Sequence, residues 1–231
     1  NKNLNLAINS NLGVPDKLVD RFIEKVQKIC EEDRVKEFVI FTSVDSWGAQ
    51  AEYIRNGLEF NRFWDNCHKV LEKCPKVILT YMVTYNALSV PNYDKLIRGV
   101  YDLKTQYGSD DRYWNSATFL DTSYLRHPKH QTVQVLEPHW ADKIYADAQL
   151  VDFLGVPLFE KEYIVYSDVE IQKLKRTFDW MKSPIPEKQL ETQRRNFGYY
   201  FRAHDERRGT DFCATFPELE EFYRKCLEIK I

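Results

Sequence analysis

The chain has little that would tie it to a nucleic acid, a membrane or an oxidising compartment. Its 231 residues carry 33 Lys and Arg against 35 Asp and Glu, which gives a formal charge of -2. A net charge this close to zero argues against nucleic acid or a membrane surface as a partner. No apolar run is long enough to span a bilayer. The five cysteines, an odd number, favour reduced thiols and a cytoplasmic location over a disulfide framework.

Patterns that would bind a metal are also scarce. Cys30, Cys67 and Cys74 fall on apolar helical faces, where a free cysteine behaves as a small hydrophobic residue. His127 and His130 form an H-x2-H pair in a predicted loop, but no third ligand follows at a spacing that zinc requires. We therefore expect core cysteines, loop histidines and no metal site.

What the sequence does contain is a repeated unit of an apolar strand, a polar strand end and an amphipathic helix. Apolar strands are predicted at residues 4–8, 38–41, 77–83 and 117–120. Because parallel strands are joined by crossover helices, the repeat predicts a parallel α/β sheet. Ligands of such sheets bind at the C-terminal ends of the strands. The β-prone run at residues 132–136 is predicted to add a further strand.

Two regions of different character follow one another. Residues 1–136 hold the strand and helix units, and residues 137–231 turn helical, with helix starts near Pro138, Ser167 and Pro186. A polar link is expected at residues 204–210. Arginines in this tail alternate with acidic residues, which favours a solvated, salt-bridged helix over a nucleic-acid contact.

Polar residues gather where three of the predicted strands end. The set consists of Asn9, Asn11, Ser43, Asp45, Ser46, Thr84 and Asn86. Amides, hydroxyls and one carboxylate suit the recognition of a polar small molecule, and the acid-base pair that hydrolysis needs is missing. At any single position the alternative is a helix cap or a turn residue. Three strand ends together favour a ligand site.

The order of these motifs resembles the middle of a radical S-adenosylmethionine (radical SAM) enzyme. The resemblance covers about residues 4–125 and rests on Asn9-Ser10-Asn11-Leu12-Gly13, Ser43-Val44-Asp45-Ser46, Arg55, Phe63 and Val83-Thr84-Tyr85-Asn86. The run from Arg207 to Leu219 also resembles the tails of radical SAM proteins. The resemblance implies a partial parallel (β/α) barrel of about four βα units of a (β/α)6-type barrel, with a mostly helical C-terminal extension and a small-molecule or peptide substrate.

Roles for the polar residues follow from the resemblance, position by position. It implies that Asn9 and Asn11 lie near the amino acid and ribose parts of SAM, and that Asn86 lies beside the adenine. Ser43 would hydrogen-bond the cofactor, and Asp45 would shape the loop or face the substrate.

The resemblance also implies that Arg55 binds the carboxylate of SAM. A planar guanidinium matches a carboxylate with two parallel hydrogen bonds, so the residue type suits the task. The alternative is an ordinary surface arginine.

The sequence departs from the family at the [4Fe-4S] cluster. Neither the C-x3-C-x2-C segment that holds the cluster nor the family's Gly-Gly-Glu segment occurs. We expect the first strands to lie upstream of Asn1, and the full-length protein to bind SAM and the cluster. For this chain alone we expect neither cofactor and no activity.

Two alternatives to the radical SAM interpretation remain open. One is a cluster-free α/β binding or scaffold protein for a small polar ligand or a partner protein. The other is an α/β-barrel hydrolase or isomerase that uses Asp45, Glu52 and the His127 loop. In any of the three, an exposed sheet edge is expected to be covered by a homodimer or by the folded-back tail.

Overall fold

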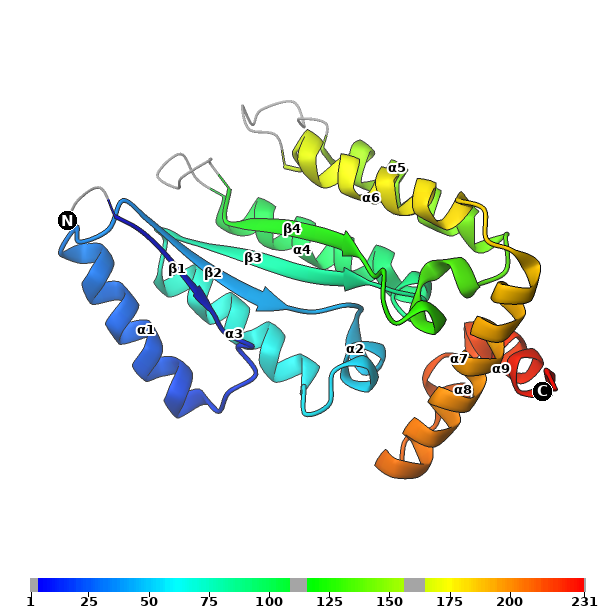
Figure 1. Cartoon of the computed structure of the whole chain (residues 1–231). Helices are drawn as coiled ribbons and strands as arrows, with labels where there is room; N and C mark the ends of the chain where they lie inside the picture. Colours follow the sequence, from blue (N-terminus) through cyan, green and yellow to red (C-terminus); the bar gives the residue numbers. More distant parts are fainter. Residues whose placement is uncertain (1–3, 109–115, 156–164, 231) are drawn as a thin grey trace.

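A four-stranded parallel sheet forms the centre of the protein, in a computed structural model that describes residues 4–108, 116–155 and 165–230 (Figure 1). The strands stand in sequence order and are β1 (Asn5–Asn9), β2 (Glu37–Ser43), β3 (Val77–Tyr85) and β4 (Thr118–Tyr124). The predicted α/β class and all four predicted strands are confirmed. The described residues form an open sheet, and a barrel is not shown.

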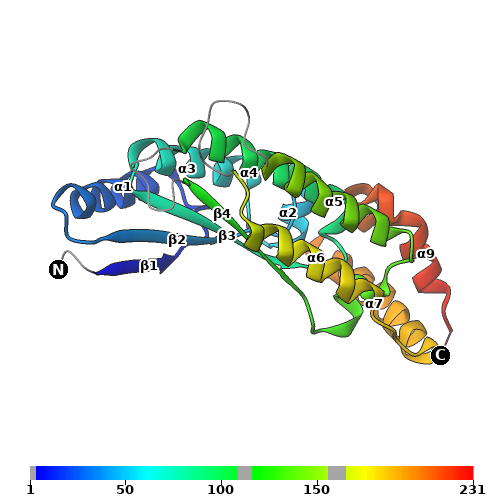
Figure 2. The ribbon, with the colours of Figure 1, turned by 90° about the horizontal axis from the view of Figure 1, so that it is seen from above.

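Helices cover one face of this sheet. Figure 2 shows them together on the same side of the strands: α1 (Asp16–Glu31), α3 (Phe60–Lys73) and α4 (Tyr93–Tyr107). Each follows a strand, as the repeated unit predicts, and buries an apolar stripe; in α1 the stripe includes Val19, Ile23 and Val26. A short helix that the pattern did not predict, α2 (Gly48–Ile54), lies between β2 and α3.

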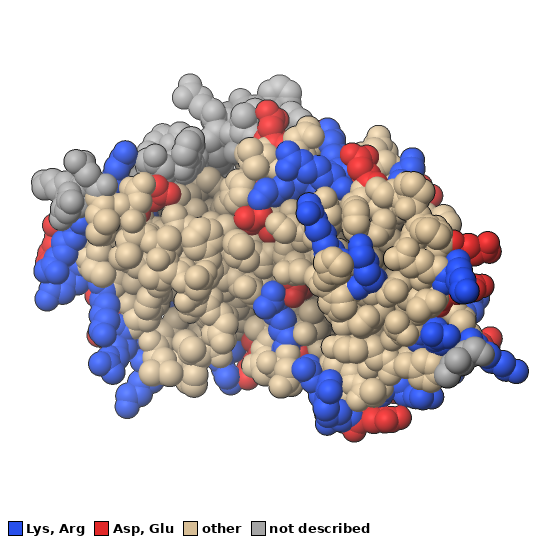
Figure 3. Space-filling model, viewed as in Figure 1, with Lys and Arg blue, Asp and Glu red and all other residues tan. Residues whose placement is uncertain are grey.

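The opposite face is open over β1, β2 and the end of β3. On β2, Phe38 and Ile40 are buried on the helix side, whereas Val39 and Phe41 on the other side are half-buried, and Met82 of β3 is exposed. Figure 3 shows a broad area over the sheet without charged side chains. Parallel sheets usually have both faces covered, so this open face is unusual.

The C-terminal part is helical, as predicted. It consists of α5 (Trp140–Gly155), α6 (Asp168–Lys182), α7 (Glu187–Arg208), α8 (Phe212–Thr215) and α9 (Glu220–Glu228), with short 3₁₀ turns η1 (Val90–Asn92), η3 (Lys129–Gln131), η4 (Val133–Val135) and η5 (Pro217–Leu219). One hydrophobic core includes residues of both predicted regions. Within the described ranges, no helix has the length and apolarity that crossing a membrane requires.

Two local predictions in this part are wrong. The link expected at 204–210 mostly continues α7 to Arg208, and Gly209 ends the helix in the left-handed conformation with a φ of 66°. The run at 132–136 forms the turn η4 and no strand, because Arg194 occupies its carbonyl groups. Arg194 Nε donates to the carbonyl of Val135 at 2.7 Å and Nη2 donates to that of Leu136 at 3.1 Å.

The two edge strands of the sheet, β1 and β4, differ in what covers their outer sides. Helix α6 lies along β4, and Glu170 Oε1 accepts a hydrogen bond from the Leu120 N–H at 2.8 Å, in place of a neighbouring strand. No strand of the described residues pairs with the outer side of β1. The tail therefore folds back on the β4 edge, and a homodimer at the β1 edge stays a prediction.

Candidate functional site

The candidate site is built around Asp45, which follows the end of β2 and is 4% exposed. Its Oδ1 accepts hydrogen bonds from the Thr84 N–H at 2.7 Å and from Arg55 Nη2 at 3.1 Å. Arg55 Nε lies 2.8 Å from Asp45 Oδ2. One carboxylate thus ties the ends of β2 and β3 to the residue that ends α2.

Charge at this pair is balanced by opposing effects. Burial is the largest effect and leaves the pKa of Asp45 above its usual range, although the Arg55 guanidinium and the Thr84 N–H offset part of the rise. The side chain of Arg55 is 32% exposed, so solvent reaches the cation but hardly the anion. The N–H of Arg55 Nε is buried and has no well-aligned acceptor among the described residues. That N–H faces Asp45 and is out of reach of a ligand. The hydrogen bond to Asp45 Oδ1, however, uses only one N–H of Nη2, so the partly exposed guanidinium keeps Nη donors that a ligand carboxylate can accept from.

The C-terminal helices hold α2, and α2 carries Arg55 at its end. Tyr53 OH donates to Asp205 Oδ1 of α7 at 2.8 Å, and its ring centroid lies 4.5 Å from that of His204. Gln50 Nε2 donates to the carbonyl of Thr215 at 3.2 Å. Burial, followed by the contact with Asp205, raises the pKa of Tyr53, so the phenol stays a hydrogen-bond donor. The tail is thus part of the support of the site.

The start of α2 is fixed by aromatic packing. The Trp47 ring lies 4.7 Å from the Phe60 ring and 4.8 Å from the Trp64 ring, centroid to centroid. It also lies against α4 at Gly99, where an added Cβ would come within 2.3 Å of the indole. Only glycine allows this approach without displacement of Trp47. Both ends of α2 are therefore anchored to other elements.

Two other predicted site residues lie at strand ends on the open face. Ser43 is half-buried and stands in register with Met82 of β3, which is itself in register with Asp121 of β4. Asn9 is exposed at the end of β1, in register with Phe41. Both positions are accessible from the open face, and both predicted roles stay predictions.

The remaining two predicted residues make local turn contacts. Asn11 Oδ1 accepts from the Gly13 N–H at 3.3 Å. Asn86 Oδ1 accepts from the Leu88 N–H at 2.9 Å, and its Nδ2 donates to the carbonyl of Thr84 at 2.9 Å. These are the turn contacts that we weighed as the alternative for single positions. Asn86 thereby shapes the same segment whose Thr84 N–H binds Asp45.

The carboxylates of the hydrolase alternative make structural contacts in the described residues. Glu52 Oε1 accepts from the Phe60 N–H at 2.7 Å and so satisfies the start of α3. Asp45 is bound by Arg55 and the Thr84 N–H, and His127 is exposed in the loop after β4. Each carboxylate already serves a structural partner, which leaves no acid-base pair at these positions.

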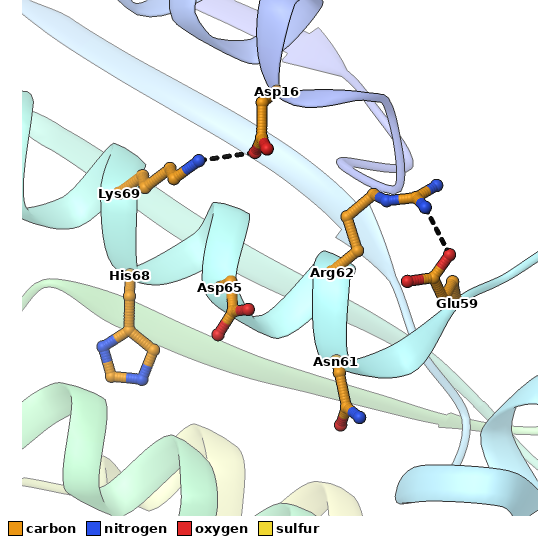
Figure 4. Close-up of a pocket in the computed structure, with 7 residues that line it drawn as sticks. All are labelled: Asp16, Glu59, Asn61, Arg62, Asp65, His68 and Lys69. Atoms are coloured by element: carbon orange, nitrogen blue, oxygen red, sulfur yellow. Dashed lines mark hydrogen bonds and ion pairs between the residues drawn. The ribbon is translucent and has the colours of Figure 1, made fainter.

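A polar groove between α1 and α3 offers no second site. In Figure 4 Asp16 and Lys69 meet on one side of α3, and their ion pair is 2.5 Å long. Arg62 pairs with Glu59 beside them at 2.5 Å. Asn61, Asp65 and His68 point away from both pairs. The lining residues thus diverge instead of surrounding a common point.

The cysteines and histidines do not assemble a metal centre in the part of the chain that the structure describes. Cys30, Cys67, Cys74 and Cys226 are buried and Cys213 is half-buried. No group of three potential ligands among His, Cys, Asp and Glu is found in these ranges. The His130 ring packs 4.9 Å from that of Tyr200, centroid to centroid, which is a packing role.

Comparisons with family models, with curated proteins and with solved structures find no match to this chain. The function is therefore inferred from the residues and from the geometry at the ends of the strands.

Proposed function

We propose that the chain is the SAM-binding part of a cytoplasmic radical SAM enzyme that acts on a small-molecule or peptide substrate. The observation that carries the proposal is the Asp45–Arg55 pair at the end of β2. A buried carboxylate fixes the guanidinium, yet the Arg55 side chain is 32% exposed and Asp45 does not use all of its Nη hydrogens. This is the preorganised cation that a ligand carboxylate requires.

The fold supports a finer proposal, that the sheet is part of the wall of a (β/α) barrel. All four strands are parallel and the helices cover one face, as in such barrels. The open face would then point into the barrel, where its uncharged residues and the strand ends would meet the ligand. Ser43 and Asn9, on that face, would contact SAM from neighbouring strands.

The residues fit one of the two cofactors and not the other. SAM carries a carboxylate, and Arg55 offers the matching donors; when bound, SAM supplies the 5′-deoxyadenosyl group. The [4Fe-4S] cluster does not fit the cysteines of this chain, because four of the five are buried and none stands in a C-x3-C-x2-C segment. We assign no cluster and no redox step to these residues.

Calorimetric titration with SAM tests the proposal directly. Although the sequence alone predicted no cofactor in this chain, the partly exposed guanidinium held by Asp45 leads us to expect that the chain binds SAM. Arg55→Gln should weaken binding about tenfold or more, since tenfold corresponds to about 1.4 kcal/mol. Arg55→Lys should restore binding only in part, because an ammonium cannot make the paired contact. Arg62→Gln, a change at a cation on the helix side, is the matched control and should leave affinity unchanged. An equal loss in both variants would contradict the proposal.

The second candidate function is a cluster-free α/β binding protein for a small polar ligand. The buried cysteines favour it, since they are core residues instead of ligands. The two candidates differ in whether the full-length protein also holds a cluster. Reconstitution with iron and sulfide of the full-length protein would yield a stoichiometric cluster for the enzyme and none for the binding protein.

A further inference from the structure

A cluster of two aromatic rings and two cations lies where β4 ends. The Tyr124 ring is stacked on the Trp180 ring of α6, with centroids 5.2 Å apart and planes 20° apart. The Arg126 guanidinium lies over Tyr124 at 5.3 Å, and Lys129 Nζ lies over Trp180 at 5.2 Å, both measured to the ring centroid. Arg126 Nη2 also donates to Tyr124 OH at 3.2 Å. The rings thus hold both cations in place.

Neither cation is neutralised by the described residues. Lys173 of α6, in contrast, pairs with Asp121 of β4. No carboxylate of the described ranges forms an ion pair with Arg126 or Lys129. Beside them, Trp180 Nε1 is buried and has no acceptor. Buried donors without a partner are rare in native proteins, so the Trp180 N–H marks a polar group of this cluster that the described residues leave unsatisfied.

The cluster lies at the same edge of the sheet as Arg55. Tyr124 of β4 stands in register with Tyr85 of β3, and the exposed Ser123 and Thr84 stand in register before them. Two strand spacings separate β2 from β4, which is about 10 Å. In Figure 3 Lys and Arg side chains, mixed with acidic ones, surround the uncharged area over the sheet. The C-terminal edge of the sheet therefore carries two cationic positions.

We propose that Arg126 and Lys129, held by Tyr124 and Trp180, bind an anionic group of the substrate, either a carboxylate or a phosphate. The inference rests on the proposed function, because it takes this edge of the sheet as the ligand-binding edge. It deepens that function by naming the substrate class as an acidic molecule. Arg55 binds the carboxylate of SAM, and the substrate's anion binds about two strands away. Cations preorganised on rings lose little entropy when an anion binds.

Titration with inorganic pyrophosphate and with citrate tests this site, and the two probes distinguish phosphate from carboxylate. Binding is measured by calorimetry at low ionic strength, because salt screens such contacts. We expect the double variant Arg126→Gln/Lys129→Gln to weaken binding of the preferred probe tenfold or more. The matched control, Lys175→Gln/Arg176→Gln on the exposed side of α6, removes the same charge and should change binding less than twofold. Equal losses, or no binding by the unaltered chain, would overturn the inference.

The same variants test the SAM site and the anion site independently of each other. SAM affinity should be unchanged in Arg126→Gln/Lys129→Gln, and pyrophosphate or citrate affinity should be unchanged in Arg55→Gln. A chain that binds the probe at Arg126 and Lys129 but does not bind SAM would refute the proposed function and keep the anion site. A chain that binds SAM through Arg55 but neither probe would refute the anion site alone.

Discussion

Two buried carboxylates hold cations at different edges of the same sheet. Glu170 of α6 seals the outer edge of β4, with Lys104 Nζ 3.0 Å from its Oε1, and Asp45 holds Arg55 at the strand ends. The anions are similarly buried, but the exposed fraction of the Lys104 side chain is 3% and that of Arg55 is 32%. The pairs therefore differ mainly in how far solvent reaches the cation.

This difference separates a structural ion pair from a candidate binding one. Every oxygen of Glu170 has a protein partner: Oε1 accepts from the Leu120 N–H at 2.8 Å, and Oε2 accepts from the Ser167 N–H at 2.8 Å. A ligand cannot reach Lys104 without opening α6. The Arg55 guanidinium is exposed to solvent and has Nη donors that Asp45 does not use, so a ligand can bind it without breaking the ion pair.

Removal of Glu170 should have the largest effect on stability. Glu170→Ala leaves the buried Lys104 without its anion and frees the Leu120 N–H, so the free energy of unfolding should fall by about 3–5 kcal/mol. Burial already lowers the pKa of Lys104, and without Glu170 the pKa should fall further. Asp45→Ala should lower the free energy of unfolding by only about 1–3 kcal/mol, because Arg55 can hydrate. Urea unfolding measures both values.

The control for Glu170 is Asp168→Asn, an exposed acidic residue in the same first helical turn. It should change the free energy of unfolding by less than about 1 kcal/mol. Equal losses for Glu170→Ala and Asp45→Ala would show that exposure of the cation does not distinguish the two pairs.

A third buried carboxylate, Asp147 of α5, sharpens the comparison. Its Oδ1 lies 2.6 Å from Lys143 Nζ, which is 29% exposed, but its Oδ2 is buried without a partner. Burial raises the pKa of Asp147 from 3.8 to about 7. The folded protein therefore binds a proton that the unfolded chain releases, and its stability should fall as the pH rises from about 4 to 7.

Asp147→Asn should remove this pH dependence. At pH 8 the variant should be more stable than the unaltered chain, by up to about 2–4 kcal/mol, since one pKa unit corresponds to about 1.4 kcal/mol. The measurement is urea unfolding at pH 5, 6, 7 and 8. Asp152→Asn, at an exposed position of the same helix, should keep the original slope. A slope that survives Asp147→Asn would assign the titration to another group.

The fold was largely predictable because its signals are local. Apolar runs and polar strand ends located the four strands, and helical stripes such as that of Val19, Ile23 and Val26 located the covering helices. The run at 132–136 failed because its β propensity is overridden by Arg194, a partner that lies about 60 residues away in the sequence. Propensity within a window does not contain such a contact.

The site was predictable only in part, for the same reason. Asp45 could be nominated from its place at a strand end and Arg55 only from the resemblance to radical SAM enzymes, and the structure places the two in contact. Asp45 also accepts a hydrogen bond from the backbone N–H of Thr84. A contact with a backbone group cannot be predicted from residue type. The support of α2 by the tail could not be read from the chain, because Tyr53 and Asp205 stand 152 positions apart.

Loss of the contact between Tyr53 of α2 and the tail should have the smallest effect on stability, and it tests whether the tail positions Arg55. Tyr53→Phe removes the hydroxyl that donates to Asp205, which should lower the free energy of unfolding by about 1 kcal/mol. Because Tyr53 lies on the short helix that ends at Arg55, SAM affinity should also fall severalfold by calorimetry. Tyr199→Phe on the exposed side of α7 should change neither quantity. If stability falls and SAM affinity does not, then the tail supports α2 without positioning Arg55. In that case Asp45 alone positions the Arg55 guanidinium.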